Sequence, residues 1–339
     1  RSFALIDREA RMDVLQEPHA VAITLPPPRR GGGLGWGHGP AGGTSRLPRS
    51  AHMSRSGCSA PRSFAFSTDS HRERTSAQRP WAGTATIASM IDNLAAYHFV
   101  AIDDPAAVAD WLRALAEAGE LRGTVLVAPE GINLFLAGRV EAIDALVAAV
   151  RADPRFAALQ IKRSRSEAVP FARLKVKVKD EIISFRRPDA MPLAAPARAP
   201  DVAPEDLARW IAQGHDDAGR RLVLLDTRNR EEVAHGSFAG ALTLPIDNFT
   251  ELPDALAPHR DGLRDATVVS FCTGGIRCEK AALWMRADGM DNVLQLDGGI
   301  LGYFERVGGF GYDGRCFVFD DRVALDPALR PLHDGVEAA

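Results

Sequence analysis

The sequence predicts an α/β protein of two domains, a ferredoxin-like βαββαβ domain followed by an α/β domain with a parallel sheet. From residue 90 onward, short apolar runs alternate with helical spacing of apolar residues, which is typical of α/β folds. A Pro/Ala-rich stretch at 188–203 has no periodicity and predicts a semi-rigid linker between the two domains. The formal net charge of −3 gives no global attraction to nucleic acid, so RNA contact would require a local basic patch.

Residues 1–89 differ from the rest of the chain. They contain Pro26-Pro27-Pro28 and Gly31-Gly32-Gly33, scattered Arg and Ser, and little periodicity. Such a segment buries too little apolar area to offset its ordering entropy, so we expect a disordered N-terminal extension. Regular patterning begins just after Met90, which makes Met90 a candidate natural start.

The first domain is expected over residues 90–187. Its order of elements, β-α-β-β-α-β, is that of a ferredoxin-like (acylphosphatase-like) unit. The expected strands and helices are Leu94–Ile102 (strand), Pro105–Gly119 (helix), Thr124–Ala128 and Ile132–Ala137 (strands), Val140–Val150 (helix), and Leu159–Lys162 and Leu174–Ile183 (strands).

The second domain is expected over 204–310, with 311–339 as a C-terminal tail. Its expected elements are Pro204–Gln213 (helix), Leu222–Leu225, Ala241–Leu244 and Thr267–Phe271 (strands), Cys278–Asp288 (helix) and Val293–Leu296 (strand). Ligands of parallel α/β sheets bind beyond the carboxyl ends of the strands. Asp226, Cys272 and Asp297 all fall at such ends.

The four cysteines, Cys58, Cys272, Cys278 and Cys316, are neither dense nor arranged as CxxC pairs. This spacing argues against a disulfide scaffold and against a structural zinc site. The chain shows neither an apolar run of membrane-spanning length nor the pattern of a secretory signal. We therefore expect free thiols, no metal, no membrane contact and a cytoplasmic location.

The loop after the strand Thr267–Phe271 is the strongest chemical feature. It reads Cys272-Thr273-Gly274-Gly275-Ile276-Arg277 and leads into a helix. The two glycines let successive backbone N–H groups turn inward to form an anion nest, and the helix N-terminus adds partial positive charge. Arg277 adds a full charge, so a thiolate at Cys272 should be stabilised and the pKa of Cys272 lowered. The same cradle would hold a persulfide.

This loop resembles that of a rhodanese domain, together with Asp226-Thr227-Arg228, the segment Gly236–Ala241 and Asp297-Gly298-Gly299. Sulfur-handling rhodaneses have four residues between the Cys and the Arg, whereas the related dual-specificity phosphatases have five. This chain has four, which disfavours phosphatase chemistry. The resemblance implies a rhodanese-like α/β second domain.

The motifs CTGGIRCEK (residues 272–280), PEGIN (129–133), LLDTRN (224–229) and CFVFDDR (316–322) resemble those of the rhodanese-domain tRNA uridine hydroxylases. The match runs from about Met90 to Arg330. It implies an oxidoreductase that converts the wobble uridine (U34) in the tRNA anticodon region to 5-hydroxyuridine. Molecular oxygen would be the co-substrate and Cys272 the catalytic cysteine, with no other cofactor evident. Unlike some members, this chain lacks a C-terminal cysteine cluster.

Several residues around the loop have two interpretations. Cys278 would either resolve an oxidised Cys272 as a disulfide or serve as a small packing residue. Arg228 would either add positive potential over the loop or form a surface salt bridge. Asp226 is expected to orient loop backbone groups, and Asp297 to cap a turn. Glu279 and Lys280 are expected to be solvated helix charges.

A basic row precedes the linker. Arg173, Lys175, Lys177 and Lys179 alternate with apolar residues, so a strand would place all four on one face. Between residues 155 and 187 there are ten Lys or Arg against three Asp or Glu. The alternatives are a solvated strand face and a contact with tRNA phosphates. The turn at Glu130-Gly131 is either a plain hairpin or a loop that reaches the RNA or the second domain.

Three classes of function follow. The first is a tRNA uridine hydroxylase, favoured by the two-domain resemblance. The second is a sulfurtransferase that passes a persulfide sulfur from Cys272, taken from thiosulfate or a sulfur carrier, which the loop alone would suggest. The third is an RNA-binding module without activity, which the intact loop disfavours. Protein partners cannot be inferred from the sequence.

Overall fold

The computed structural model describes residues 90–195 and 197–331. The expected disordered extension over residues 1–89 lies outside the described residues, and so do Cys58 and the last eight residues of the expected tail. The natural start at Met90 stays a prediction. Among those described, no helix is long and apolar enough to cross a membrane.

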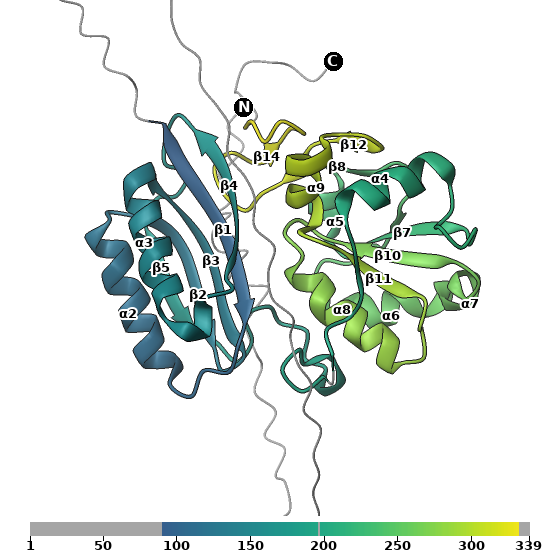
Figure 1. The fold of residues 1–339 in the computed structure, drawn as a ribbon, viewed down its shortest axis with the longest axis horizontal. Helices are drawn as coiled ribbons and strands as arrows, with labels where there is room; N and C mark the ends of the chain where they lie inside the picture. Colours follow the sequence, from purple (N-terminus) through teal and green to yellow (C-terminus); the bar gives the residue numbers. More distant parts are fainter. Residues whose placement is uncertain (1–89, 196, 332–339) are drawn as a thin grey trace, which may run out of the picture. The chain divides into compact units, whose positions relative to one another are not determined.

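The first domain is a five-stranded sheet with two helices on one face (Figure 1). Its elements are β1 (Ile91–Phe99), α2 (Pro105–Ala118), β2 (Arg122–Ala128), β3 (Gly131–Arg139), α3 (Val140–Ala152), the short 3-10 helix η1 (Pro154–Phe156), β4 (Gln160–Ser166) and β5 (Leu174–Val178). The sheet order is β4-β1-β3-β2-β5. Strands β1 to β4 with α2 and α3 form the expected βαββαβ unit, and β5 adds a parallel edge strand beside β2.

The alternating faces of these strands divide the domain into a core and a helix-free face. Leu94, Val125, Ile132 and Leu134 point toward the helices and are buried in the core with Leu112. Pro105 in the first turn of α2 and the Asp104 side chain, which accepts from the Ala107 N–H at 3.0 Å, fix the start of α2. The helices thus cover one face of the sheet and leave the other free to line a cavity.

The strand expected over Leu174–Ile183 ends early, at Val178. The Lys179 N–H still bonds to the Val127 carbonyl at 2.8 Å. The Ile182 N–H instead donates to the Glu130 carboxylate at 2.8 Å, so the chain leaves the sheet at that point. The side chain at Glu130 therefore ends the strand, which alternation of apolar residues alone did not indicate.

The second domain has a five-stranded, all-parallel sheet in the order β6-β11-β10-β7-β9. Its elements are β6 (Asp201–Val202), α4 (Pro204–Gln213), β7 (Leu222–Asp226), α5 (Arg230–Val233), β8 (Gly236–Phe238), β9 (Leu242–Thr243), η3 (Phe249–Glu251), α6 (Leu252–Leu256), η4 (Ala257–His259), α7 (Arg260–Leu263), β10 (Thr267–Phe271), α8 (Ile276–Ala287), β11 (Val293–Leu296) and α9 (Gly299–Val307). Side chains of α6, α7 and α8 pack on one face of this sheet, and those of α4 and α9 pack on the other. The α/β fold class is confirmed for both domains.

The stretch at 188–203 is more ordered than the expected linker. It begins with a 3-10 helix, η2 (Pro188–Ala190), and ends in β6, which pairs with β11. The Gln295 N–H bonds to the Pro200 carbonyl and the Asp297 N–H to the Val202 carbonyl, both at 3.0 Å. Its last residues therefore belong to the second sheet.

The described part of the expected tail is also structured. It forms β12 (Tyr312–Gly314), β13 (Cys316–Phe317) and β14 (Ala324–Leu325), of which β12 pairs with β8. Cys316 and Leu325 are fully buried in the core that contains α9. This segment is therefore a packed extension of the second domain as far as the structure describes it.

Candidate active site

The expected convergence of strand ends is present in the second sheet. Strands β7, β10 and β11 are parallel neighbours. Asp226, the last residue of β7, therefore lies at the same edge as Cys272 and Asp297, which directly follow β10 and β11. Cys272 is the first residue after β10, and the loop that follows it leads into α8. Helix α8 begins at Ile276, two residues before the expected start at Cys278. Gly275, with a φ of 101°, turns the chain directly into the helix.

Cys272 is fully buried and its Sγ accepts the Gly275 N–H at 3.2 Å. Burial alone would raise the pKa of this thiol. A hydrogen bond from Cys278, the charge of Arg277, and the backbone N–H groups of Arg277 and Gly275 outweigh burial and lower the pKa of Cys272 to about 5. Cys272 is therefore a thiolate at neutral pH, as the anion-nest interpretation expected.

Cys278 lies beside Cys272 and is also fully buried. Its Sγ is 3.7 Å from Thr227 Oγ1. Burial, together with the neighbouring thiolate, raises the pKa of Cys278 well above its ordinary value, so Cys278 is the protonated partner that donates to Cys272. Both cysteines are unbridged. A disulfide between them remains a prediction.

The positive charge of Arg277 is paired with a buried carboxylate. Its guanidinium forms a two-pronged ion pair with Glu232 of α5, at 2.5 and 2.7 Å. Glu232 also accepts the Thr273 hydroxyl at 3.2 Å. Burial opposes ionisation of this carboxyl, but Arg277 holds its pKa below the usual value. Glu232 was missed by the sequence analysis because it lies 45 residues before Arg277 on another element.

The glycines of Asp297-Gly298-Gly299 bring the start of α9 against the loop. The Ile300 N–H bonds to the Cys272 carbonyl at 2.9 Å, and the Leu301 N–H to the Thr273 carbonyl at 3.0 Å. A Cβ at Gly299 would lie 2.5 Å from the Cys272 carbonyl oxygen, and φ there is +63°. Only glycine permits this approach.

Arg228 corrects one of its two sequence interpretations, the surface salt bridge, whereas its positive charge does act on Arg277 of the loop. It is fully buried rather than on the surface, and its guanidinium is held by Asp226 at 2.7 and 2.9 Å and by the Gly236 carbonyl at 2.7 Å. Asp226 also accepts the Arg228 N–H and the Ser237 hydroxyl. Asp226 thereby orients the backbone directly after β7, and a role in orienting the Cys272 loop stays a prediction. The ion pair fixes the strand end beneath the site, and neither residue lines the cavity.

Glu279 and Lys280 are not solvated helix charges, which is the second correction. Both are buried, with exposed fractions of 7% and 2%. Glu279 accepts the Tyr97 hydroxyl of the first domain at 3.3 Å and pairs with Arg198 at 2.8 Å. The helix that carries Cys278 therefore directs its next two residues toward the first domain and the linker.

Lys280 joins the two domains at the PEGIN turn. Its Nζ lies 2.8 Å from Glu130, 2.6 Å from Glu181 and 3.0 Å from the Ile183 carbonyl. The turn is thus a hairpin, between β2 and β3, and also a loop that reaches the second domain. Gly131 has a φ of 148°, and a Cβ there would lie 2.0 Å from the His98 carbonyl oxygen, so this turn requires glycine.

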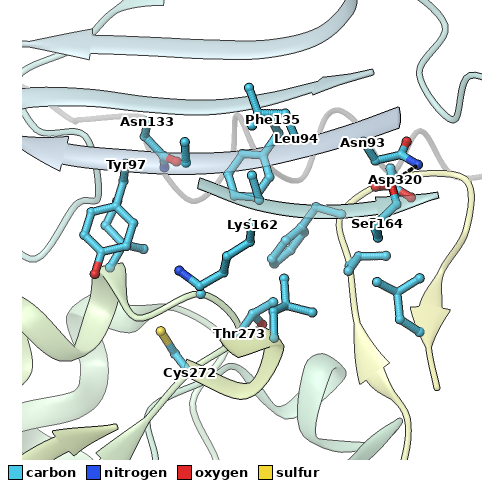
Figure 2. Close-up of a pocket in the computed structure, with 18 of the residues that line it drawn as sticks. Asn93, Leu94, Tyr97, Asn133, Phe135, Lys162, Ser164, Cys272, Thr273 and Asp320 are labelled. Atoms are coloured by element: carbon cyan, nitrogen blue, oxygen red, sulfur yellow. Dashed lines mark hydrogen bonds between the residues drawn. The ribbon is translucent and has the colours of Figure 1, made fainter. Parts of the chain in front are cut away.

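A cavity of about 130 Å³ lies over the loop of Cys272. The helix-free face of the first sheet lines it with Tyr97, Phe135 and Lys162, and the loop lines it with Cys272 and Thr273 (Figure 2). Other lining residues of note are Asn93, Asn133, Ser164, Phe319, Asp320 and Arg322. The thiolate therefore faces a space built by both domains and by the C-terminal segment.

The CFVFDDR motif contributes a buried ion pair, which also bonds to the first domain, to the lining of this cavity. Arg322 forms a two-pronged ion pair with Asp320, at 2.8 and 2.5 Å, and donates to the Ser164 hydroxyl of β4 at 2.6 Å. Cys316 is fully buried, and burial raises its pKa to about 12. Among residues 90–195 and 197–331, no group of three or more His, Cys, Asp or Glu could hold a metal ion.

Lys162 of β4 is a second residue that the sequence analysis missed. It pairs with Ala95 across the sheet, which places it on the cavity face, and Figure 2 shows it extending toward the loop of Cys272. Burial lowers the pKa of Lys162, whereas the charge of Cys272 opposes that shift. A lysine in an ordinary strand, 110 residues before the cysteine, carried no motif signal.

The basic row lies on the same face of the first sheet. Lys175 and Lys177 belong to β5 and pair with Thr124 and Leu126 of β2, and Leu126 lines the cavity. Arg173 and Lys179 flank the strand, and Leu174 and Val176 pack on the helix side as expected. Burial and the neighbouring Lys179 lower the pKa of Lys177. The row therefore extends the cavity face to the edge of the sheet.

Comparisons with known proteins agree with this two-domain architecture. The family model described as "UPF0176 acylphosphatase like domain" matches residues 91–182, and that of the rhodanese-like domain matches 203–306. A protein of Xanthomonas euvesicatoria pv. vesicatoria named "tRNA uridine(34) hydroxylase" is 68% identical over 250 residues, covering 74% of this chain and 100% of that protein. The chain belongs to the tRNA uridine(34) hydroxylase family. The resemblance inferred from the motifs is confirmed.

Further relatives and one solved structure are similar to parts of the chain. A Xylella fastidiosa protein of the same name is 66% identical over 245 residues, which is 72% of this chain and 95% of that protein. The solution structure of a rhodanese-like domain from Anabaena is 20% identical, covers 34% of this chain and 79% of that domain, and has a TM-score of 0.28.

Proposed function

We propose that this protein hydroxylates uridine 34 of tRNA, with Cys272 as the catalytic residue. The observation that carries the proposal is a stabilised thiolate on the wall of a cavity that both family domains build. Relatives that match over nearly their whole length bear the name tRNA uridine(34) hydroxylase. The product at this wobble position is 5-hydroxyuridine.

The surface around the cavity supports a tRNA substrate. The basic row of Lys175 and Lys177, flanked by Arg173 and Lys179, shares its sheet face with the cavity. Lysines on such a face contact phosphates of the RNA backbone, and the anticodon nucleotide enters the cavity as an unstacked base. Aromatic side chains at Tyr97 and Phe135 offer a stacking surface for that base.

Molecular oxygen is the oxidant in this proposal, and the reaction takes place in the cytoplasm. The cysteines that the structure describes, Cys272, Cys278 and Cys316, are all unbridged, which fits a reducing compartment. The thiolate of Cys272 is the nucleophile in this proposal. Its burial excludes water, which would otherwise solvate the thiolate and weaken it as a nucleophile.

The test is mass spectrometry of tRNA nucleosides from cells with and without the gene, complemented with wild type or Cys272→Ser. Loss of 5-hydroxyuridine and its derivatives, restored by wild type alone, is the expected result. Loss of a thiolated nucleoside instead would indicate the sulfurtransferase activity that the four-residue loop also accommodates. An unchanged nucleoside profile would contradict both activities.

A further inference from the structure

Lys162 reaches the catalytic cavity from the opposite domain. It lies on β4, on the same sheet face as Tyr97 and Phe135, and its side chain extends toward the loop of Cys272 (Figure 2). The end of the side chain runs along the start of α9, where a Cβ at Gly298 would lie 3.5 Å from Lys162 Cε. The lysine side chain therefore lies within van der Waals reach of the start of α9.

The ammonium of Lys162 lacks a hydrogen-bond or ion-pair partner among residues 90–195 and 197–331. Its Nζ lies over the face of the Tyr97 ring, 5.8 Å from the ring centroid. The charges of Cys272, Asp297 and Glu305 act on it only at longer range. Two other cations around the loop, Arg277 and Lys280, are paired with carboxylates. A desolvated ammonium without an acceptor costs free energy, which a ligand with an acceptor would recover.

Uracil supplies such an acceptor. Its C4 position bears a carbonyl oxygen, whereas cytosine bears an amino group there. A lysine ammonium has three donors and no acceptor, so it favours the carbonyl. The same oxygen takes up negative charge when a nucleophile adds to C6 of the ring, because C5, C6 and the C4 carbonyl are conjugated. The cavity thus holds a nucleophile, Cys272, and a cation suited to that charge, Lys162.

We propose that Lys162 is a catalytic residue that donates a hydrogen bond to O4 of the target uracil while Cys272 adds to C6. This inference rests on the proposed function. In the step, a lone pair of the Sγ thiolate forms the Sγ–C6 bond and the C5=C6 π bond breaks. Its electrons form the C4=C5 bond, and the pair of the former C4=O π bond remains on O4 as an enolate, next to the ammonium. C5, the carbon that becomes hydroxylated, is thereby electron-rich.

Addition of Sγ to C6 can be detected without oxidation, because the adduct exchanges its C5 hydrogen with solvent before Sγ leaves. The enolate takes a proton from water at C5, one of the two C5 hydrogens is then lost, and Sγ leaves C6. The net result is exchange of the C5 hydrogen with solvent. The experiment incubates the full chain with a tRNA transcript bearing U34 in D₂O without oxygen, and measures deuterium at C5 of U34 by mass spectrometry.

Three variants are compared with the wild type. Lys162→Met should slow C5 exchange and lower kcat for hydroxylation about 100-fold, the effect of losing one donor to a developing oxyanion. Lys162→Arg keeps a cation and should retain part of the rate. Arg139→Met removes one positive charge from an exposed side chain of the same domain and should exchange like the wild type. Binding of tRNA and the melting temperature are measured for each, so that a folding defect is recognised.

Exchange by Lys162→Met at the wild-type rate, in a folded variant that binds tRNA, would overturn the role of Lys162. A wild-type protein that hydroxylates U34 in air but exchanges no C5 hydrogen would overturn the addition step. Both results leave the proposed function standing. A wild-type protein that does not hydroxylate U34 at all would contradict the proposed function and this inference together.

Discussion

At the scale of single residues, the site is a thiolate held by four neighbouring groups. The Gly275 and Arg277 N–H groups, the Arg277 charge and the Cys278 thiol all favour the charged form of Cys272 against the effect of burial. Arg277 can be buried beside them because its charge is paired with that of Glu232. The site therefore concentrates charge without leaving the arginine unpaired.

The charge of Cys272 has a measurable pH dependence. Because the pKa of Cys272 is lowered to about 5, the ultraviolet absorbance of the thiolate should be present at neutral pH and disappear as the pH falls through about 5. Cys278→Ala removes one donor to the thiolate, so its midpoint should lie at higher pH. Cys272→Ser should abolish the transition near pH 5, because burial raises the pKa of Cys278 and raises that of Cys316 to about 12. A midpoint near the ordinary thiol value in the wild type would contradict this account.

The cysteine that we propose as nucleophile could be located from the sequence, but its surroundings could not. Cys272, Gly275 and Arg277 are close in the chain, and the chemistry of a nest can be inferred from adjacent residues. Glu232 and Lys162 come from other elements, so only the folded chain brings them to the loop. Glu279 and Lys280 looked like solvent-facing charges because nothing in a helix sequence reveals that another domain covers it.

At the scale of elements, α8 connects the chemistry to the domain interface. Its first turn carries Arg277, and the next residues are Cys278, Glu279 and Lys280, each of which contacts a different partner. Helix α9 holds the loop from the other side through the Ile300 N–H. The position of the loop is thus fixed by two helix starts.

The ion pairs of Lys280 with Glu130 and Glu181 should contribute strongly to the free energy of unfolding. Lys280→Met leaves Glu130 and Glu181 without their cation, and breaking such a buried pair costs about 3–5 kcal/mol. Denaturant unfolding should show this decrease in the free energy of unfolding. The matched control is Arg264→Ala, which breaks an exposed pair with Asp261 and should change stability by less than about 1 kcal/mol. Equal effects of the two substitutions would contradict the assignment.

Element positions were predictable where patterns are local. Two strands and one helix have the predicted bounds, since apolar runs and a proline at a helix start are local signals. They are Thr267–Phe271, Val293–Leu296 and Pro204–Gln213. Leu174–Ile183 is shorter than expected because a distant carboxylate, Glu130, takes the Ile182 N–H. Strand β6 was missed because two residues are too few to show a period.

At the scale of the whole molecule, the cavity over Cys272 belongs to neither domain alone. The first sheet supplies Lys162 and Tyr97, the second domain supplies Cys272, and the C-terminal segment supplies Asp320. The sequence predicted both folds and their order, but a cavity between non-adjacent segments depends on packing that no motif encodes. The basic row continues the same sheet face to the edge of the first sheet, where we propose that it contacts the RNA backbone.

That row predicts a salt effect on tRNA binding. The double variant Lys175→Met and Lys177→Met should bind tRNA more weakly, and the slope of log K against log salt should fall by about 0.7 to 0.9 for each phosphate that the variant no longer neutralises. The measurement is a salt titration of tRNA binding by fluorescence anisotropy. Arg264→Ala, an exposed position in the second domain, serves as the control for charge. An unchanged slope in the double variant would remove the row from the tRNA interface.

Hydroxylation of U34 by way of the Cys272 thiolate has a direct test with purified components. Wild type and Cys272→Ser are incubated with a tRNA transcript and oxygen, and 5-hydroxyuridine at position 34 is measured by mass spectrometry. We expect product with the wild type and none with Cys272→Ser, although the variant still folds and binds tRNA. Full hydroxylation by Cys272→Ser would contradict the catalytic role of this cysteine.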